Sequence, residues 1–498
     1  MNRQRLFKKN GVESKIITVN YSTNVVDHVA YWHLQHTDLI NLYDYFAESS
    51  DLPEARTTLS KLGYQTKDYR FEADGDQVKI FSTTSLVMIA HLFADEQGGV
   101  YSLDFLDAKQ RVIRTDYYDT RGYRSMSQYF AKADNAQENW VVLEQFFTVA
   151  GRIFLEKYYI RGDNGAGKLN HMRLTLKTGQ SYMLENKTAL YRSFIEQLAL
   201  DLPGTVTFIA DRQGELSRAM AFSQVPARKI LCIHNLHYAP YDDPKHAHLA
   251  YDALAKTDEL SRVDMIIAST PQQAADIQRR IYSQVPVVSV PVGMVSDSLI
   301  QQPQVPIAAP TRHQGKIVAV ARLFWQKNLA DAIRAFAIAR QTLPWLTFDI
   351  YGYGDARDQY HEEKQLKKLV AELHLQACVS FLGHTNNIAA VYDHAQMMVL
   401  TSRFEGFALA LLEAHAHGVP VVTYDINYGP ASIVQAGQSG FLVAPGDYRQ
   451  LAEKLVQVFS DQPLLAALSQ GAYQVATRFS EAAIWQQWHH NVIQRSGK

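Results

Sequence analysis

Two basic residues in the C-terminal half of the chain have a spacing suited to binding a diphosphate. Arg322 and Lys327 follow the strand-like run 316–320 and precede a helical segment that begins near Leu329. Cations at a strand-to-helix turn neutralise phosphate oxygens, and the positive end of the helix dipole strengthens their effect. Two solvated cations at a helix start are the alternative, and these residues alone do not decide between the two.

Two acidic residues form a second candidate group. Glu405 ends the loop after the strand-like run 397–401, and Glu413 lies about two turns along the next helical segment. Gly406 allows close approach of a ligand to the backbone, and the N–H groups after it can bind hydroxyl or phosphate oxygens. A carboxylate that accepts from two neighbouring hydroxyls holds a sugar ring. The alternative is that they are two unrelated surface acids. The Leu-rich helical segment between them should be buried, which makes that alternative weaker.

Further polar residues follow other strands. The segment 425–432 is a Gly/Pro turn that leads into a helix, and by itself it is a weak signal for a ligand-binding backbone. His234 closes the strand-like run 229–234, where it faces the sheet edge that binds ligands in α/β folds, and His237 is the second candidate. A lone histidine is more often a satisfied loop or core residue, so His234 depends on the other motifs.

Buried-type strands alternate with helices on both sides of a Pro-rich stretch at 301–310. The predicted strands are 205–211, 229–234 and 265–270 before it, and 316–320, 346–352, 397–401 and 419–423 after it. Strands that are apolar on both faces and joined by helices form parallel sheets with right-handed crossovers. The pattern predicts two doubly wound α/β domains that bind substrates at the carboxyl ends of their strands.

A different pattern occupies residues 51–184. Short runs of β-branched and aromatic residues are separated by Gly and Asp turns, which is typical of antiparallel hairpins. Packing on the sheet is the default role of the many tyrosines, and an interface or an acceptor platform is the alternative: Tyr117, Tyr118, Tyr123, Tyr129, Tyr158 and Tyr159. Residues 162–169 match the spacing G-x-x-x-x-G-K of a phosphate loop, but Leu169 replaces the Mg²⁺-binding Ser/Thr and no helix follows, so we interpret them as a turn.

The composition excludes several classes of protein. The 498 residues are 47% hydrophobic and 20% charged, which excludes wholesale disorder. A net charge of -1 argues against a general nucleic-acid binder, while a local basic groove within that balance stays open. Cys232 and Cys378 cannot form a disulfide framework or a thiolate metal site. No signal peptide or membrane-spanning run is found, so we predict a cytoplasmic protein, and the basic segment 1–9 leaves open a peripheral position at the inner face of the membrane.

Together these residues resemble the retaining glycosyltransferases of the family 4 type, which have the α/β GT-B fold of two Rossmann-like domains facing a cleft. The signature is a Glu-x7-Glu motif, here Glu405 and Glu413, with an Arg-x4-Lys pair, here Arg322 and Lys327. The resemblance implies that Arg322 and Lys327 bind the diphosphate of a UDP-sugar. It also implies that Glu413 holds the ribose and that Glu405 contacts the transferred sugar.

The resemblance implies further contacts with the donor. The backbone of Gly406 and Phe407 lies beside the sugar, and the strand end at His384 lies where relatives hold the base. His234 approaches the reaction centre, so the expected catalytic group is His234 with the basic pair and Glu405. No metal or other cofactor is expected, because two cations replace Mg²⁺ and no Asp-x-Asp motif stands at a strand end.

The resemblance also implies a division into domains, and this chain departs from the family pattern at its N-terminus. The expected division is 1–50 with 185–300 as the N-terminal domain, 51–184 as an inserted antiparallel β module, 301–478 as the UDP-sugar domain, and 479–498 as a helix crossing back to the N-terminal domain. Met1 is expected to fall within the first helix, so that the first strand and the Gly-rich loop of the family are missing.

The inserted β module limits the resemblance to two groups of enzymes within this family. It is similar to that of poly(glycerol-phosphate) α-glucosyltransferases of wall teichoic acid synthesis, and equally to that of enzymes that place GlcNAc on Ser/Thr of surface adhesins. Both imply transfer of glucose or GlcNAc to a polymeric or protein acceptor. They also imply a homo-oligomer, or a heterodimer with a glycosyltransferase-like partner, formed through the module.

Two other functions are the alternatives to this one. A non-catalytic partner subunit that binds the acceptor is the main alternative, but such partners lose the basic pair and the paired Glu that this chain keeps. A phosphorylase-like enzyme would need a lysine for pyridoxal phosphate and a far longer chain.

Overall fold

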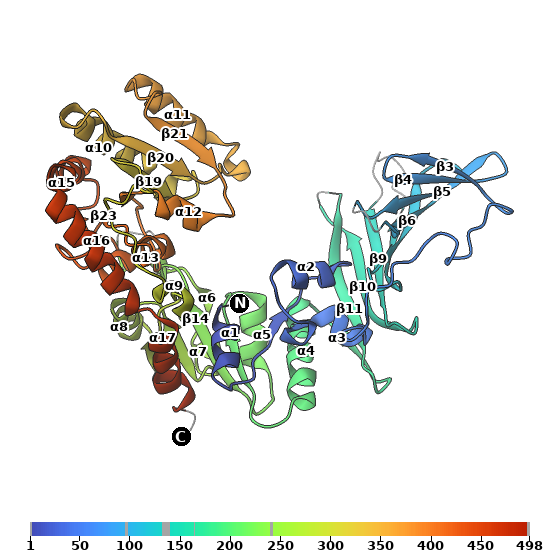
Figure 1. Ribbon diagram of the computed structural model, residues 1–498. Helices are drawn as coiled ribbons and strands as arrows, with labels where there is room; N and C mark the ends of the chain where they lie inside the picture. Colours follow the sequence, from blue (N-terminus) through green and yellow to red (C-terminus); the bar gives the residue numbers. More distant parts are fainter. Residues whose placement is uncertain (1, 95–97, 132–139, 164, 240–242, 496–498) are drawn as a thin grey trace. The chain divides into compact units, whose positions relative to one another are not determined.

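The computed structural model describes residues 2–94, 98–131, 140–163, 165–239 and 243–495 (Figure 1). The chain divides into two compact units, one made of 1–204 with 218–226 and the other of 205–217 with 227–498. Among the described residues, no helix combines the length and the apolar character needed to cross a membrane. The domain boundaries expected from the sequence stay a prediction.

A ten-stranded antiparallel sheet dominates the first unit, and each of its strands pairs with the next along the chain. The strands are β3 Arg70–Asp74, β4 Gln77–Ser82, β5 Ser85–Leu92, β6 Val100–Leu106, β7 Val112–Tyr118, β8 Arg124–Ala131, β9 Trp140–Phe147, β10 Ile153–Arg161, β11 Gly167–Thr175 and β12 Ser181–Leu184. This sheet confirms the predicted antiparallel hairpins.

The phosphate-loop-like run lies at the turn between β10 and β11. Residue 164 lies outside the described residues; around it, Gly162 N donates to Ala166 O at 2.7 Å and Gly165 N donates to Gly162 O at 2.9 Å. The residues after the turn continue into β11 and not into a helix. The interpretation as a turn is confirmed.

Helices and a small sheet complete the first unit. They are α1 Asn2–Lys9, β1 Ile16–Thr18, α2 Val25–Tyr31, β2 Leu39–Asn41, α3 Leu42–Ala47 and α4 Lys187–Asp201. β1 pairs in parallel with β2 in a two-stranded sheet of their own. The buried Arg121 donates to Asp44 and to Asp119, each at 2.6 Å, and so ties α3 to the turn after β7. Its charge is balanced because both carboxylates accompany it into the interior.

The N-terminal part of the second unit contains a four-stranded parallel sheet in the order β13-β14-β17-β18. Its strands are β13 Thr207–Ala210, β14 Arg228–Ile233, β17 Met265–Ala268 and β18 Val287–Ser289, with a small hairpin of β15 Tyr238–Ala239 and β16 His248–Leu249 nearby in the chain. The helices of this part are α6 Asp252–Ala255, α7 Thr257–Leu260, α8 Pro271–Arg280 and α9 Asp297–Ile300; the residues of α5 Glu215–Phe222 are divided between the two units. Thr270 caps α8 by accepting from Gln273 N, with Pro271 in the first turn.

The C-terminal part contains a six-stranded parallel sheet in the order β21-β20-β19-β22-β23-β24. The strands are β19 Lys316–Val320, β20 Thr347–Tyr351, β21 Val379–Gly383, β22 Met397–Leu400, β23 Val421–Tyr424 and β24 Gly440–Val443. The helices are α10 Leu329–Thr342, α11 His361–Glu372, α12 Ile388–Asp393, α13 Leu409–Ala416, α14 Gly429–Ile433, α15 Tyr448–Ser460, α16 Gln462–Thr477 and α17 Glu481–Trp488. Both parallel sheets confirm the predicted doubly wound α/β architecture.

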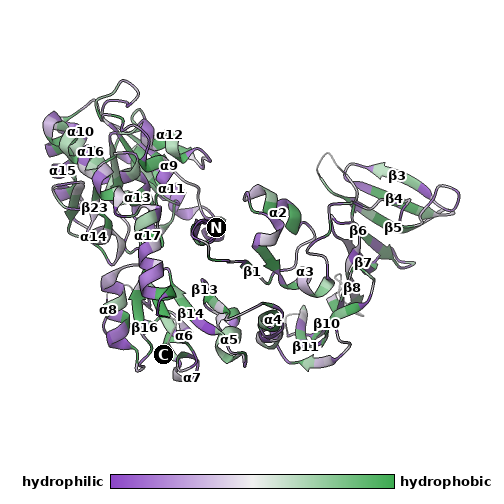
Figure 2. Cartoon of the chain, turned by 60° about the horizontal axis from the view of Figure 1, so that its bottom comes forward, coloured by the Kyte–Doolittle hydropathy of each residue, from purple (hydrophilic) through white to green (hydrophobic). Residues whose placement is uncertain are grey.

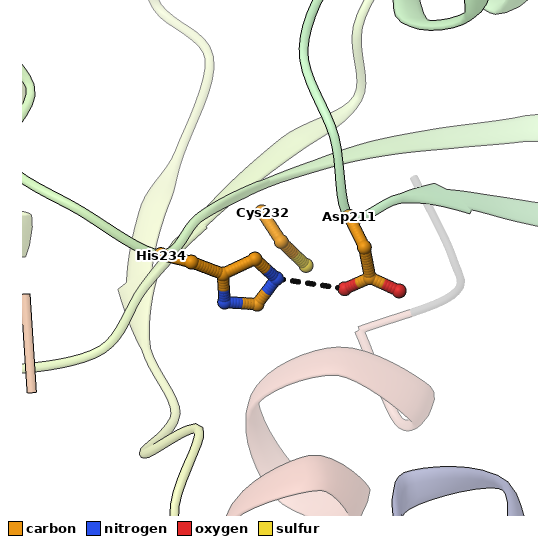
Figure 3. Close-up of side chains that lie close together, drawn as sticks. All are labelled: Asp211, Cys232 and His234. Atoms are coloured by element: carbon orange, nitrogen blue, oxygen red, sulfur yellow. Dashed lines mark hydrogen bonds and ion pairs between the residues drawn. The ribbon is translucent and has the colours of Figure 1, made fainter. Parts of the chain in front are cut away.

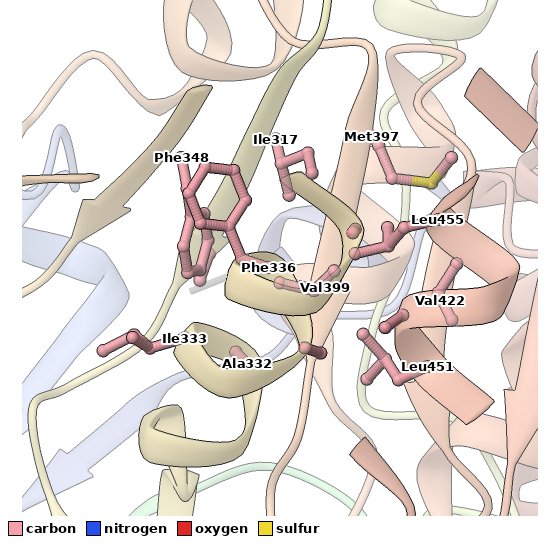
Figure 4. Close-up of a cluster of buried hydrophobic side chains, with 14 of the residues drawn as sticks. Ile317, Ala332, Ile333, Phe336, Phe348, Met397, Val399, Val422, Leu451 and Leu455 are labelled. Atoms are coloured by element: carbon pink, nitrogen blue, oxygen red, sulfur yellow. The ribbon is translucent and has the colours of Figure 1, made fainter. Parts of the chain in front are cut away.

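Helices α10 and α15 pack on this sheet through one hydrophobic core (Figure 4). Phe336 of α10 contacts Phe348 of β20 with ring centroids 5.5 Å apart, and both side chains are fully buried. Burial of each such ring contributes about 1.5–3 kcal/mol. The helices carry hydrophobic and hydrophilic residues together, as expected for a layer with one face on the core (Figure 2). This core fixes the sheet whose strand ends carry the candidate residues.

Candidate active site

The structure brings one predicted cation and one predicted acid into direct contact. β19 pairs with β22, so the loops that leave their carboxyl ends are neighbours. Lys327 Nζ lies 2.5 Å from Glu405 Oε1, and Ser402 Oγ donates to the same oxygen at 2.7 Å. The side chains of Lys327 and Glu405 are only 18% and 11% exposed. Two motifs that are 78 residues apart therefore form one charged pair at the sheet edge.

Hydrogen bonds lock the two loops together around this pair. Gln326 Nε2 donates to Phe404 O at 3.0 Å, and Arg403 N donates to Gln326 O at 2.8 Å. Thr401 Oγ1 donates to the carbonyl of Asn328 at 2.9 Å, where the backbone has a φ of 47° before α10 begins. The position of Lys327 is thus set by backbone contacts on both sides, as a pre-organised cation requires.

Arg322 lies apart from this pair. Its side chain is exposed, with Cζ 5.6 Å from the ring centroid of Phe324, and among the described residues it forms no ion pair. Arg357 lowers the pKa of Asp355 to about 2, and the charge of Arg322 adds to that effect. The structure thus brings Lys327 to Glu405 and leaves Arg322 with its guanidinium open to solvent.

Glu413 lies on α13, beyond the loop that carries Glu405. Its side chain is exposed, and Oε2 accepts from the hydroxyl of the buried Tyr392 at 3.3 Å. Desolvation by nearby protein atoms raises the pKa of this carboxyl. The Tyr392 hydrogen bond opposes that rise and orients one carboxylate oxygen, and the other carboxylate oxygen can accept a hydrogen bond from a ligand.

Gly406 lies directly against the end of β14. A Cβ at this position would lie 2.1 Å from the carbonyl oxygen of His234, far inside contact distance. Only glycine permits this approach, which joins the loop after β22 to the strand end that carries His234. The glycine is therefore needed for close packing of two protein loops, a role that the sequence did not indicate.

The side chain of Phe407 lies in the protein interior. It is buried against Phe479, with ring centroids 5.7 Å apart, and it lies where a side chain on Gly293 would be. The buried side chain leaves only the backbone of Phe407 for a ligand, and the donor contact expected there stays a prediction. The carbonyl of Phe407 in turn lies 1.9 Å from where a Cβ of Gly429 would be.

The segment 425–432 supports the backbone of Glu405. Glu405 N donates to Asn427 O at 3.1 Å, and Tyr428 N donates to Glu405 O at 2.7 Å. Asn427 Nδ2 also donates to the hydroxyl of Tyr238 at 2.9 Å, within a buried cluster of Leu236, Tyr238, Ala247, Phe404 and Tyr428. This turn therefore holds the loop that carries Glu405, called the acidic loop below, between the N-terminal and the C-terminal parts of the second unit.

His234 forms a pair with an acid that the sequence analysis did not select. Asp211 follows β13, and its Oδ1 lies 2.9 Å from His234 Nε2 (Figure 3). The side chain of His234 is 36% exposed, so the ring can be reached from solvent. Asp211 directly follows a strand, as His234 does, and this shared placement could have identified Asp211 as a candidate from the sequence.

His237 and His384 have different surroundings. His237 is fully buried, its ring stacks on Tyr428, and neither ring nitrogen has a partner among the described residues. Burial lowers its pKa to about 4, so it is a neutral core residue. His384 is exposed after β21, with Nε2 3.1 Å from Asn386 Oδ1 and its ring at the edge of Tyr353.

Comparisons with known proteins agree with this architecture. Residues 306–475 match the family model of Glycosyl transferases group 1. The UDP-N-acetylglucosamine--peptide N-acetylglucosaminyltransferase GtfA subunit of Streptococcus pneumoniae is 25% identical over 98% of this chain and 94% of its own length. The poly(glycerol-phosphate) alpha-glucosyltransferase of Bacillus subtilis is 23% identical over 91% of this chain and 65% of its own length.

The solved structure of the pneumococcal O-GlcNAc transferase GtfA in complex with UDP and GlcNAc has a TM-score of 0.78 to this chain. It is 22% identical and covers 99% of this chain and 94% of its own. The fold likeness extends over both α/β sheets and the antiparallel sheet, so this chain has the GT-B fold that the sequence resemblance implied.

Proposed function

We propose that this chain, a GT-B glycosyltransferase whose residues 306–475 form a Glycosyl transferases group 1 domain, transfers glucose or GlcNAc from a UDP-sugar to a hydroxyl with retention of configuration. The observation that carries the proposal is the contact of Lys327 with Glu405, beside the strand end that bears His234. It joins a diphosphate-binding cation to a sugar-binding acid at one sheet edge. The two relatives with UDP-sugar and glucosyl names support the donor class.

The donor diphosphate is bound by Lys327 and Arg322. The ammonium group has three donors, so Lys327 can keep its bond to Glu405 while another N–H reaches a phosphate oxygen. The exposed guanidinium of Arg322 adds a planar pair of donors. These two cations stabilise the charge that develops on the leaving UDP, so we expect no requirement for a divalent metal.

The two acids hold hydroxyl groups of the donor. Glu405 Oε1 is occupied by Lys327 and Ser402, which leaves Oε2 to accept from hydroxyls of the transferred sugar. Glu413, oriented by Tyr392, accepts from the ribose. Backbone atoms of Gly406 and Phe407 lie beside the sugar, and those around His384 lie on the base side.

Transfer occurs on one face of the sugar ring. UDP departs and the acceptor hydroxyl attacks from the same side, which retains the configuration without a covalent intermediate on the protein. Asp211 accepts from Nε2–H of His234 and fixes its ring. Nδ1 is then an acceptor, which can take a hydrogen bond from a sugar hydroxyl at the reaction centre.

The names of the relatives support a proposal on the acceptor and the assembly. One is named for a peptide acceptor and is called a subunit, and the other is named for poly(glycerol-phosphate). We therefore propose a polymeric or protein acceptor and no nucleic acid. Assembly through the antiparallel module gives a homo-oligomer or a heterodimer with a glycosyltransferase-like partner. Strand β12 at its edge exposes Tyr182 and Met183, which suits such a contact.

The predicted domain division and location belong to the same proposal. The last helices return to the N-terminal sheet, since Arg228 donates to Val492 O and Asn491 Nδ2 donates to Ser289 O at 3.5 Å. That contact supports 479–498 as a crossing helix between 1–50 with 185–300 and 301–478. We propose a cytoplasmic location, peripheral at the inner face of the membrane through the basic helix α1.

The test is the release of UDP from UDP-glucose and from UDP-GlcNAc in EDTA, with poly(glycerol phosphate) and a Ser-rich peptide as acceptors. Lys327→Ala should lose about 100- to 1,000-fold in kcat, as does removal of one donor to a developing anion. Lys367→Ala is the matched control, because Lys367 pairs with Glu363 on the exposed face of α11. A loss below about threefold in Lys327→Ala would refute its assigned role.

A further inference from the structure

We infer that Asp211, Cys232 and His234 form a binding site for a transition-metal cation, for which Zn²⁺ is the best match. One carboxylate oxygen, the Sγ atom and one imidazole nitrogen all lie within 4.8 Å of one another (Figure 3). Counting cysteines excluded a site built on thiolates, but it did not test a set of three different ligands. No ion is expected here from the transfer reaction itself.

The strands of the N-terminal sheet place these side chains together. Cys232 lies on β14, and His234 comes two positions later, directly after the end of that strand, so both side chains project to the same side. β13 pairs in parallel with β14, and Ala210 is the partner of Leu231. Asp211 and Cys232 are therefore level on neighbouring strands, about 4.8 Å apart in backbone position. The juxtaposition is a property of the strand register, which a packed sheet holds firmly.

The site is closed on one side and open on the other. Cys232 is 3% exposed, whereas the side chains of His234 and Asp211 are 36% and 46% exposed. A cation can enter from the solvent side, and water can supply the fourth ligand of a tetrahedral zinc ion. The buried sulfur gives the site its preference for Zn²⁺, Co²⁺ or Ni²⁺ over the oxygen-seeking Mg²⁺ and Ca²⁺.

Binding an ion requires side-chain shifts of about 1 Å, because the ligand atoms lie within 4.8 Å of one another. In a tetrahedral zinc site with bonds of about 2.0–2.3 Å, the ligand atoms lie about 3.3–3.6 Å apart. The contact of His234 Nε2 with Asp211 Oδ1, now 2.9 Å, must open by less than about 1 Å, which the exposed Asp211 side chain allows. Binding releases the thiol proton of Cys232 to solvent, and the proton on Nε2 of His234 moves to Nδ1 through solvent.

This proton shift makes zinc an inhibitor, a consequence that rests on the proposed function. With Nδ1 protonated and Nε2 held by the ion, His234 no longer accepts from a sugar hydroxyl, and it loses its bond to Asp211. Zn²⁺ should then lower glycosyl transfer in the same concentration range in which it binds, and EDTA should restore it.

The first experiment measures binding without reference to activity. Metal-free protein is titrated with Co²⁺, whose thiolate charge-transfer absorption in the near ultraviolet reports a Co–S bond. We expect one ion per chain, loss of the band in Cys232→Ala, and weakening of the apparent Kd by about tenfold or more in the exposed variant Asp211→Asn. Cys378→Ala is the matched control, since Cys378 is also buried but lies directly before β21, and the band of this variant should match wild type.

The result that overturns the site is the absence of the band in wild type, or its persistence in Cys232→Ala. Thermal unfolding of each variant shows that it is folded, and Asp211→Asn gives a test that leaves the core unchanged. In the second experiment, Zn²⁺ should inhibit UDP release by wild type and by Cys378→Ala but not by Cys232→Ala. Cobalt binding without zinc inhibition would overturn the link to His234. No transfer by metal-free wild type would count against the proposed function alone.

Discussion

The close approach of Gly406 to His234 makes a strong prediction for the substitution Gly406→Ala. The added Cβ would lie 2.1 Å from His234 O and 2.9 Å from the Cα of Asn235, whereas ordinary contacts begin near 3.4 Å. Both neighbours are backbone atoms and cannot rotate away. The acidic loop and the end of β14 must therefore separate by more than about 1 Å, because no side-chain change relieves the overlap.

Two effects of different size follow from this separation. Overpacking of this kind costs about 1–3 kcal/mol in the free energy of unfolding. A displacement of about 1 Å between groups that act on one substrate can lower kcat about 100-fold. Activity should therefore fall much more than stability does. The free energy is measured by urea unfolding, and kcat by UDP release with the preferred donor.

Gly446→Ala is the control for this experiment. Gly446 has a φ of 83° and open space around its Cβ position, so alanine there costs about 1 kcal/mol of backbone strain and moves no loop of the candidate site. A Gly406→Ala protein with kcat close to that of Gly446→Ala would refute the reasoning. It would mean that the acidic loop and the His234 strand end need not be in contact during the reaction.

Two further predictions concern buried polar groups. Ser402→Ala removes one of the two hydrogen-bond donors on Glu405 Oε1. The free energy of unfolding should fall by about 1 kcal/mol, and kcat should fall by about tenfold. Unchanged kinetics would show that Lys327 alone positions the acid. Burial lowers the pKa of His237 from its ordinary 6.5 to about 4, so between these pH values the unfolded chain binds a proton that the folded chain does not. Because of this residue, the free energy of unfolding should decrease by up to about 3 kcal/mol as the pH falls from 7 to 4. Urea unfolding of His237→Gln should show a shallower pH dependence than that of wild type. The pKa of His415 is also about 4, so His415 accounts for part of the slope that remains.

Much of the fold could be predicted because local residue patterns identify its strands. Runs such as 316–320 and 397–401 are apolar on both faces, and parallel sheets require that pattern. The loops after such strands must reach the carboxyl edge, so Arg322 and Glu405 were placed at the correct edge before any contact was known. The hairpins of the first unit were equally local, because Gly and Asp turns separate strands of β-branched and aromatic residues.

The contacts at the site could not be predicted in the same way. Lys327 meets Glu405 because β19 pairs with β22, although β20 and β21 come between them in the chain. Strand order depends on the packing of the whole sheet, and local patterns do not contain it. The role of Gly406 was missed for the same reason, since the atom that excludes a side chain belongs to the other sheet of the unit.

Residues that act on other residues were the hardest to find. Ser402 and Asp211 have no motif of their own, and each gains its meaning only from the partner it touches. His237 shows the reverse case: its sequence position near His234 suggested a ligand contact, but its ring is fully buried beside Tyr428. Burial depends on what covers a residue, and the covering residue here lies 191 positions further along the chain.

In the proposed reaction, the pairing of Lys327 with Glu405 links recognition of the diphosphate to recognition of the sugar. A partly buried ion pair adds little net stability, because desolvation of both charges offsets most of their attraction. Its value in the proposed reaction is positional: Glu405 holds the ammonium group near the diphosphate, and the same carboxylate accepts from the sugar. Removal of a sugar hydroxyl would thus disturb the carboxylate that orients the cation. The chain's selectivity for its donor sugar is then expressed in kcat as well as in binding, because the group that contacts the sugar also positions the charge that stabilises the leaving UDP.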